Sequence, residues 1–302
     1  MLKKKILITG AGGMIGPHLI KKLIDNGYLP VVIFRSECSK KRLNILKKKI
    51  IQHKLDLRNK KKLKEIISLH KPDVVFHLAS SYMNSNRLGE IDHYIINVNI
   101  FLNLLHALNG LNSRIIYTGT VAQYKQNCRI RESTISDPPN NYGVSKQIAS
   151  LLGSQLCKTY GYEFVDLRLF SPYGMKEKSS RLIPSVIKSL LKDKFIEINN
   201  GKEKRDYTYI DDVVEAMFKC ITNKKVVGKT INICSGKSVE IIKIVELIQK
   251  ILGVKKKIID KKKSSVINYT TDNKLALELL NWKPKVKLNE GLRKTIDLLL
   301  NG

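Results

Sequence analysis

Residues 5–16 read KILITGAGGMIG, a short apolar run followed directly by a cluster of glycines. The apolar run predicts a buried strand, and the hydrophobic spacing after it predicts a helix over residues 15–24. Gly10, Gly13 and Gly16 therefore lie in a strand–turn–helix junction. There, the first glycine allows a tight turn, the second lets the backbone approach a pyrophosphate, and the third lets the helix pack closely on the strand. The helix N-terminus then presents free N–H groups and a partial positive charge.

This junction predicts a dinucleotide site, although a glycine-rich turn without a ligand would show the same spacing. The expected cofactor contacts in it are Gly10, Gly13, Met14, Ile15 and Gly16. The second predicted strand, residues 31–34, ends at Arg35 and Ser36, where an enzyme selecting NAD would often carry a carboxylate. A guanidinium binds a 2′-phosphate well, so we expect NADP(H) to be preferred, with NAD(H) possible. An exposed arginine without a role is the alternative in so basic a chain.

The rest of the chain alternates between predicted strands and helices as far as about residue 171. Continuously apolar strands are expected at residues 5–9, 31–34, 50–55, 73–78, 114–117 and 163–169. Helices are expected at residues 15–24, 60–69, 92–108 and 142–160. This alternation is typical of an α/β protein with a doubly wound parallel sheet. Later helices are expected at residues 211–221, 240–252, 273–280 and 289–300.

Two domains are therefore expected within the 302 residues. Residues 1–171 would bind the dinucleotide, and residues 172–302 would form a smaller mixed α/β substrate lobe, with part of residues 205–235 returning to the first domain. The net charge is +29, but the lysines lie in short scattered runs, so no nucleic-acid or membrane partner is predicted. Attraction of an anionic small substrate remains open.

The N-terminal residues and the cysteines bear on the location of the protein. The basic start is followed by only a short apolar stretch, and no apolar run approaches the ~20 residues that span a bilayer. We therefore expect a first strand and a cytoplasmic protein. The five cysteines lack metal-ligand spacing, so we expect reduced thiols and no metal site.

Tyr142 and Lys146 lie four residues apart in the stretch NYGVSK, residues 141–146. In a helix both side chains project from one face, and a nearby cation lowers the pKa of a phenol. Such a pair could transfer a proton near neutral pH. In a chain with twelve tyrosines and many lysines, the spacing also arises by chance.

Together these features resemble the extended short-chain dehydrogenase/reductases that act on nucleotide sugars, the NAD-dependent epimerase/dehydratase family. The resemblance covers nearly the whole chain. Besides the glycine loop and the Tyr142/Lys146 pair, the matching positions are Asp56-Leu57, His77-Leu78-Ala79-Ser80, Asn97-Val98-Asn99, Thr120, Arg168 to Gly174, Arg181 to Pro184, Arg205 to Val213, and Leu280 to Pro284.

The resemblance implies a Rossmann-type fold, hydride transfer to or from a sugar, and a catalytic set of Thr120, Tyr142 and Lys146. Tyr142 would be the general acid/base, Lys146 would hold the nicotinamide ribose and lower the tyrosine pKa, and Thr120 would position the reacting oxygen. Further cofactor contacts would be Arg35, Ser36, Asp56, Leu57, Leu78, Ala79, Ser80, Asn97, Tyr142, Lys146 and Phe170. Contacts with a nucleotide-diphosphate sugar would be Ser81, Thr120, Ser171, Arg181 and Arg205.

Several departures from the family pattern reduce the number of reactions that are expected for this chain. Ser171 replaces the usual Asn, and Val121-Ala122 follows Thr120 where 4,6-dehydratases carry Asp-Glu. The expected NADP preference and the missing Asp-Glu pair together predict a 4-keto-sugar reductase, with a 4-epimerase as the alternative and a non-catalytic RNA-binding or redox-sensing protein as the remote one. Arg205 would grip the diphosphate, unless it pairs with Asp206 or Asp211.

The resemblance also implies a homodimer formed by pairing two long helices from each copy. The side chains that could supply the contact are Leu151, Leu152 and Leu156, which could equally pack on the sheet.

Overall fold

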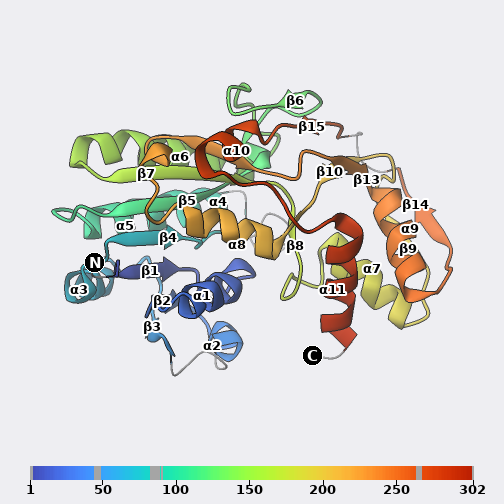
Figure 1. Cartoon of the computed structure of the whole chain (residues 1–302), viewed down its shortest axis with the longest axis horizontal. Coiled ribbons are helices and arrows are strands. Elements are labelled where there is room, and N and C mark those ends of the chain that lie inside the picture. The colour runs from blue at the N-terminus through green and yellow to red at the C-terminus, as the bar shows by residue number, and fades with distance from the viewer. Residues whose placement is uncertain (1–2, 44–48, 82–88, 90, 263–266, 301–302) are drawn as a thin grey trace.

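The computed structural model describes residues 3–43, 49–81, 89, 91–262 and 267–300. Its larger part is a seven-stranded sheet in the order β12-β7-β5-β4-β1-β2-β3, and every neighbouring pair is parallel (Figure 1). The strands are β1 (Ile6–Thr9), β2 (Val31–Phe34), β3 (Ile51–Lys54), β4 (Val74–His77), β5 (Arg114–Thr120), β7 (Glu163–Leu169) and β12 (Thr230–Ile233). The strand order reverses between β1 and β4, which is where such sheets bind ligands.

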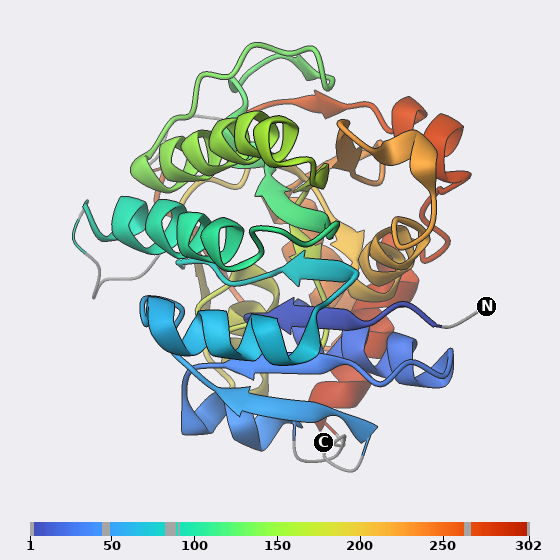
Figure 2. The same ribbon diagram turned by 90° about the vertical axis from the view of Figure 1, so that its left-hand side faces the viewer.

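Helices cover both faces of this sheet. One face carries α3 (Lys60–His70), α5 (Ile100–Ala107) and α6 (Asn141–Tyr160), which lie side by side, cyan to green in Figure 2. The other face carries α1 (Ile15–Asp25), α8 (Ile210–Lys219) and α10 (Lys274–Leu280). The buried residues that join helices to sheet include Leu63, Phe101 and Ala149 on the first face and Leu19, Met217 and Trp282 on the second. The predicted doubly wound α/β fold is confirmed.

The second lobe lies to the right in Figure 1. Its helices are α7 (Leu182–Leu191), α9 (Ile241–Leu252) and α11 (Leu288–Leu300). Its short strands pair as β8 (Pro172–Tyr173) with β11 (Thr208–Tyr209), β9 (Ile196–Ile198) with β14 (Ile258–Asp260), and β10 (Lys204–Asp206) with β13 (Ser238–Glu240). Isoleucines dominate the core of this lobe, and Met14 and Ile15 pack against it. The start of α1 therefore lies where the two lobes meet.

The chain returns to the first domain after residue 171. β12 extends the large sheet, and α8 and α10 bury apolar residues against it. Trp282, just after α10, donates from Nε1 to the carbonyl of Asp212 in α8 at 2.9 Å. Residues 274–282 therefore pack with the half of the chain that carries the large sheet, which a division at residue 171 did not anticipate.

Three helical segments differ from the sequence predictions. Neither α2 (Glu37–Leu43) nor α7 was predicted from the sequence. Pro184 occupies the first turn of α7, where a missing N–H costs nothing. The helix expected over residues 92–108 consists of α4 (Asp92–Tyr94), a π-helical turn η2 (Ile95–Asn99) and α5.

Two further strands, β6 (Arg129–Ile130) and β15 (Thr270–Thr271), form a small parallel pair, and η3 (Val121–Gln123) and η4 (Lys224–Val226) are single 3₁₀ turns. Within the ranges described above, no helix combines the length and the apolar character needed to cross a membrane.

Candidate active site

The glycine loop joins β1 to α1 as the sequence predicts. Gly10 has a φ of +67°, and a Cβ on it would lie 2.5 Å from the backbone nitrogen of Ala79 at the end of β4. A Cβ on Gly16 would lie 1.9 Å from the carbonyl oxygen of Ala11. Both positions therefore require glycine, one for the turn and one for the close packing of α1 on the strand. The Gly13 amide donates to the Gly10 carbonyl at 3.0 Å and closes the loop.

The N-terminus of α1 suits a phosphate. Met14 precedes the helix without capping it through a side chain, and the first turn holds no acidic residue. The free N–H groups and the helix dipole are therefore not already neutralised. This end of α1 lies at the carboxyl edge of the sheet, beside the point where the strand order reverses. The loop residues thus fit the pyrophosphate of a dinucleotide.

The end of β2 is basic. Arg35 and Ser36 are both exposed there. Hydrogen bonds from Arg58, at 2.8 and 3.0 Å, lower the pKa of Asp56, and the charge of Arg35 adds to this effect. Arg35 therefore lies near Asp56, on the side where the ribose and adenine are expected. A second guanidinium, Arg42, donates to the carbonyl of Gly12 at 3.2 Å.

The apolar residues predicted to contact the cofactor differ in exposure. Leu78 and Ala79 are half-buried at the carboxyl end of β4, opposite Gly10. Leu57 is buried in the core shared with α3 and α5. Phe170 is fully buried beside Tyr124 and Tyr269, so its ring is enclosed by protein.

Tyr142 and Thr120 are brought together by the start of α6. Asn140 caps this helix, since its Oδ1 accepts from the Gly143 amide at 2.9 Å. A Cβ on Gly143 would lie 2.1 Å from the carbonyl oxygen of Ala122, in the turn that follows Thr120. The absence of a side chain at Gly143 therefore lets α6 lie directly on this turn. Thr120 itself caps η3, with Oγ1 accepting from the Ala122 amide at 3.3 Å.

The phenol of Tyr142 lies among polar groups. Burial raises its pKa, while hydrogen bonds with Ser80 and Thr120 and the charge of Arg181 oppose that rise. The net direction is opposite to the predicted one, in which Lys146 lowers the pKa. Tyr142 is therefore protonated at neutral pH in this structure. Ser80, Thr120 and Tyr142 form a cluster of three hydroxyls at the carboxyl edge of the sheet.

Lys146 lies deeper than the phenol. Its side chain is 2% exposed, and its Nζ is 4.1 Å from the centre of the Tyr117 ring. Burial lowers its pKa to about 7, and the charge of Asp166 partly opposes this. A buried ammonium needs hydrogen-bond acceptors. Ribose hydroxyls supply such acceptors, so Lys146 fits a dinucleotide as well.

A buried polar network around Asn97 supports the cluster from behind. Asn97 Oδ1 accepts from Ser80 Oγ at 3.0 Å and from the Ser81 amide at 2.7 Å. Its Nδ2 donates to Ser81 Oγ at 2.9 Å and to Ser145 Oγ at 2.8 Å. His93 Nδ1 lies 2.8 Å from Ser81 Oγ. The Ser81 hydroxyl, predicted to contact substrate, is thus already bound by two side chains.

Sequence reasoning did not find two members of this network. His93 packs edge-on against the ring of Tyr142, with ring centres 6.0 Å apart, and Ser145 donates to the carbonyl of Tyr142 at 2.8 Å. Ser145 lies inside the NYGVSK stretch, so its proximity to Tyr142 could have been predicted from the sequence. His93 lies four residues before Asn97, a spacing that places both side chains on one face of a helix, so it too could have been found from the sequence. The π-helical turn η2, which begins two residues after His93, is of a kind that is frequent at functional sites.

The predicted substrate residues Arg181 and Arg205 each hold a carboxylate. Arg181 Nε lies 3.2 Å from Glu177 Oε1, and Arg205 Nε lies 2.6 Å from Glu203 Oε1. The pKa of Tyr207, which burial raises to about 12, is influenced by Arg205, Glu177 and Arg181. The charges of both ion pairs therefore act on Tyr207. Sequence reasoning missed both acidic partners.

Asp206, one of the two partners suggested for Arg205, has another role. Its carboxylate accepts from the amides of Ser235, Gly236 and Lys237 at 2.7–3.1 Å. Asp211, the other one, lies 3.6 Å from His18. Arg205 pairs with Glu203 instead. Ser171 has a φ of +28°, a region in which asparagine is more favourable than serine, and it is buried.

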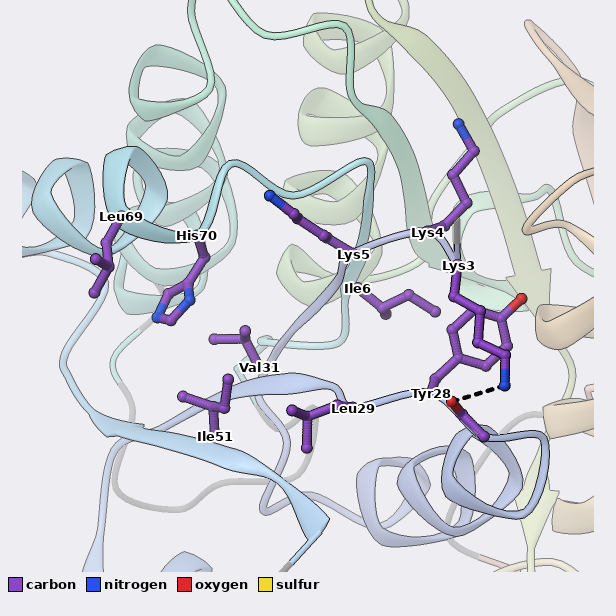
Figure 3. A pocket seen from close by; sticks show the side chains of 11 residues that line it. Lys3, Lys4, Lys5, Ile6, Tyr28, Leu29, Val31, Ile51, Leu69 and His70 are labelled. Atoms are coloured by element: carbon purple, nitrogen blue, oxygen red, sulfur yellow. Dashed lines mark hydrogen bonds between the residues drawn. The ribbon is translucent and has the colours of Figure 1, made fainter. Parts of the chain in front are cut away.

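One pocket, with a volume of about 400 Å³, lies away from this cluster (Figure 3). It is lined by Ile6, Val31 and Ile51, the first residues of β1, β2 and β3, together with Lys3 to Lys5. It is therefore at the amino edge of the sheet, opposite the glycine loop. Ligands of open α/β sheets bind at the carboxyl edge, so this pocket is not the candidate active site.

The fold and this arrangement define an extended short-chain dehydrogenase/reductase. Residues 6–234 match the model of the family described as NAD dependent epimerase/dehydratase family, and the chain belongs to that family.

Relatives within the family carry out different reactions. The chain is 30% identical to a dTDP-4-dehydro-6-deoxyglucose reductase of Escherichia coli, with 97% of each chain covered. It is also 30% identical to a protein of Bacillus subtilis described as an uncharacterized UDP-glucose epimerase, with 98% of each covered. Among solved structures, it resembles UDP-glucuronic acid 4-epimerase from Bacillus cereus in complex with UDP-glucuronic acid and NAD. The TM-score is 0.91 at 27% identity, covering 98% of this chain and 99% of that one.

Proposed function

We propose that this protein is an NAD(P)H-dependent reductase that acts on a nucleotide-activated 4-keto sugar. The observation that carries the proposal is the hydroxyl cluster of Ser80, Thr120 and Tyr142, which lies at the carboxyl edge of the sheet beside the glycine loop. Lys146 is buried next to it with a pKa lowered to about 7. This combination provides a proton donor, a hydrogen-bond donor and a ribose-binding cation in one place.

Tyr142, Thr120 and Lys146 would each have a separate role in the reduction. The chemistry that a nicotinamide cofactor would supply here, once bound, is the hydride for the sugar carbonyl carbon. Tyr142 gives its phenolic proton to the oxygen that becomes negative, and Thr120 donates a hydrogen bond to the same oxygen. Because burial raises the pKa of Tyr142, the phenol carries the proton that a reduction consumes. Lys146 would hold the ribose hydroxyls of the cofactor and thereby help to orient it.

A 4-epimerase is the second candidate, because a relative described as an epimerase is as similar to the chain as the reductase is. It would use the same Thr120, Tyr142 and Lys146, but would begin by removing a proton from a sugar hydroxyl. A dehydratase is disfavoured, since Val121 and Ala122 offer no acid or base after Thr120.

NADP(H) is the cofactor form that we propose, with NAD(H) as the alternative. Arg35 is exposed at the end of β2, and the nearby acid Glu37 is paired with Lys54 at 2.5 Å. A 2′-phosphate would therefore meet a guanidinium that forms no ion pair within the described residues. Fluorescence titration of the wild type with NADPH and NADH tests this, and equal dissociation constants would contradict it.

The nucleotide sugar would lie across the two lobes, with its diphosphate on Arg205 and its sugar near Arg181. Arg205 is one-third exposed while Glu203 holds its guanidinium, so the arginine is oriented and keeps donors for a phosphate. We also propose a homodimer through α5 and α6. Leu151 on α6 is 60% exposed and Ile95 in the neighbouring π-helical turn is 40% exposed. Light scattering on a sizing column tests the dimer.

The decisive experiment combines mass spectrometry and turnover. The purified protein is examined for bound cofactor, then mixed with NADPH and a panel of nucleotide 4-keto sugars. Loss of NADPH in proportion to reduced sugar supports a reductase. Interconversion of sugars with no net cofactor loss indicates the epimerase. Neither outcome with any nucleotide sugar would refute the proposed function.

A further inference from the structure

Asp166 is a buried acidic residue that the mechanism above does not use. It lies on β7, is 1% exposed, and pairs with Arg168 of the same strand, whose Nε lies 3.3 Å from Oδ2. The Ser150 hydroxyl of α6 donates to the same oxygen at 2.6 Å. Oδ1 of Asp166, like one oxygen of Glu177, is buried and has no hydrogen-bond partner in the part of the chain that the structure describes. A buried polar atom without a partner is costly, so its presence needs a reason.

The sheet and α6 both place Asp166 close to Lys146. Asp166 on β7 is directly opposite Tyr117 on β5, so the two side chains lie on the same face of strands that are only about 4.8 Å apart. On that face, Nζ of Lys146 lies 4.1 Å from the centre of the Tyr117 ring. Ser150, which donates to Asp166, follows Lys146 by one turn of α6. The carboxylate therefore lies beside the ring that the ammonium covers.

Gly119 leaves the room that this carboxylate occupies. A Cβ on Gly119 would lie 2.4 Å from Asp166 Oδ1. Gly119 follows Tyr117 by two residues on β5, so it lies on the same face and nearer to Thr120. The unpaired oxygen is therefore turned toward the carboxyl end of β5, where the hydroxyl cluster lies.

Asp166 is the described acid that acts on Lys146. Burial lowers the pKa of Lys146 to about 7, and the charge of Asp166 opposes this. The other titratable groups around the ammonium are Tyr117 of β5, His77 of β4, Tyr142 of α6, His93 of α4 and Arg168 of β7. Burial raises the pKa values of both phenols, so they are uncharged near neutral pH, and imidazole and guanidinium groups carry no negative charge. Within the described residues, Asp166 is therefore the counter-charge of this buried ammonium.

We propose that the Asp166 carboxylate keeps Lys146 in its ammonium form and so positions the group that would hold the cofactor ribose. This inference rests on the proposed function and adds to it a residue on which the role of Lys146 depends. A nearby opposite charge shifts a pKa by about one to three units. The lower end applies here, because the two groups form no direct ion pair among the described residues. Loss of Asp166 should therefore move the deprotonation of Lys146 from about pH 7 to about pH 6.

Calorimetric titration with NAD⁺ from pH 5 to pH 9 tests the inference. NAD⁺ is the probe because it lacks the 2′-phosphate, whose second pKa of about 6 would alter the pH profile. We expect wild-type affinity to fall as the pH rises through about 7, and Lys146→Met to abolish this fall. Asp166→Asn removes the charge at nearly constant shape. It should bind NAD⁺ about fivefold more weakly than the wild type at pH 7 but almost equally at pH 5, where Lys146 is an ammonium in both. Ser150→Ala keeps the carboxylate and should retain the wild-type midpoint.

The outcomes separate the two proposals. If the wild type binds neither NAD⁺ nor NADP⁺, the proposed function fails and this inference fails with it. If NAD⁺ affinity does not change from pH 5 to pH 9, or if its fall persists in Lys146→Met, only the inference fails. Equal weakening by Asp166→Asn at pH 5 and pH 7 indicates a structural role for Asp166 and also overturns the inference. Asp166→Ser, a smaller uncharged variant, replaces Asp166→Asn if that protein does not fold, and the wild-type profile requires no variant.

Discussion

The burial of Glu177 predicts how stability responds to pH. Burial raises the pKa of this carboxyl group from its usual 4.5 to about 7, although Arg181 opposes the rise. Between these two pH values the folded protein binds the proton that the unfolded chain has released. The contribution of Glu177 to stability is therefore fully present below about pH 4.5 and is lost as the pH rises through about 7.

The size of the effect follows from the two pKa values. A difference of about 2.5 pH units corresponds to about 3 kcal/mol, of which roughly 2.5 kcal/mol falls between pH 5 and pH 8. Glu177→Gln cannot ionise and keeps the neutral form at every pH. Between pH 5 and pH 8, the free energy of unfolding of the variant should therefore rise by roughly 2.5 kcal/mol relative to that of the wild type. With ~2.1 cal/mol/K of unfolding entropy per residue, a chain of this length should show a relative gain in Tm of ~4 °C.

Thermal melting of the ligand-free protein at pH 5 and pH 8, followed by circular dichroism, measures this difference. The control is Glu246→Gln, whose carboxylate is about half exposed on α9. Its Tm relative to the wild type should be nearly the same at both pH values. The reasoning is refuted if the Tm difference between Glu177→Gln and the wild type is the same at pH 5 and pH 8.

Three further substitutions test the site. Tyr142→Phe should lower kcat by about 10²- to 10⁴-fold, while cofactor fluorescence shows unchanged binding; near wild-type turnover would exclude Tyr142 as the acid. Gly16→Ala would place a Cβ 1.9 Å from the Ala11 carbonyl oxygen, so Tm and cofactor affinity should both fall, and an unchanged Tm would contradict the packing. Asn97→Leu removes the partner of Ser80, Ser81 and Ser145, and should lower Tm by several degrees and reduce kcat. Normal turnover in that variant would show that the network does not position the hydroxyl cluster.

Local sequence signals predicted most of the first domain. The ranges 31–34 and 163–169 coincide with β2 and β7, because strands buried on both faces are continuously apolar. The glycine loop was found because its geometry depends on residues adjacent in sequence. The helix α7 was missed at Pro184, whose effect depends on its position within the helix. The second lobe was less predictable, because its short strands pair over long sequence distances.

The sequence indicates which residues could form the site more readily than it indicates how deeply they are buried or in which direction their pKa values shift. Tyr142–Lys146 spacing places two side chains on one helix face, but it does not show how deeply each is buried. In the folded chain Lys146 lies over Tyr117, and desolvation dominates the pKa values of both members of the pair. Glu177 also has no local signal, since nothing near it in sequence shows that one carboxylate oxygen will be buried without a partner.

The burial of Tyr142 and Lys146 affects whether the phenol is ready to give a proton to the sugar or to remove one from it. A phenol that is to remove a proton from a sugar hydroxyl needs nearby positive charge to stabilise its phenolate form. The two candidate cations are weakened here: Arg181 is paired with Glu177, and the pKa of Lys146 is lowered to about 7. A protonated Tyr142 is thus the favoured state before substrate binds. That state can deliver a proton to a carbonyl at once, whereas an oxidation must first remove the proton. This state of the ligand-free site suits the reduction proposed above, which the cofactor-loss assay distinguishes from epimerisation.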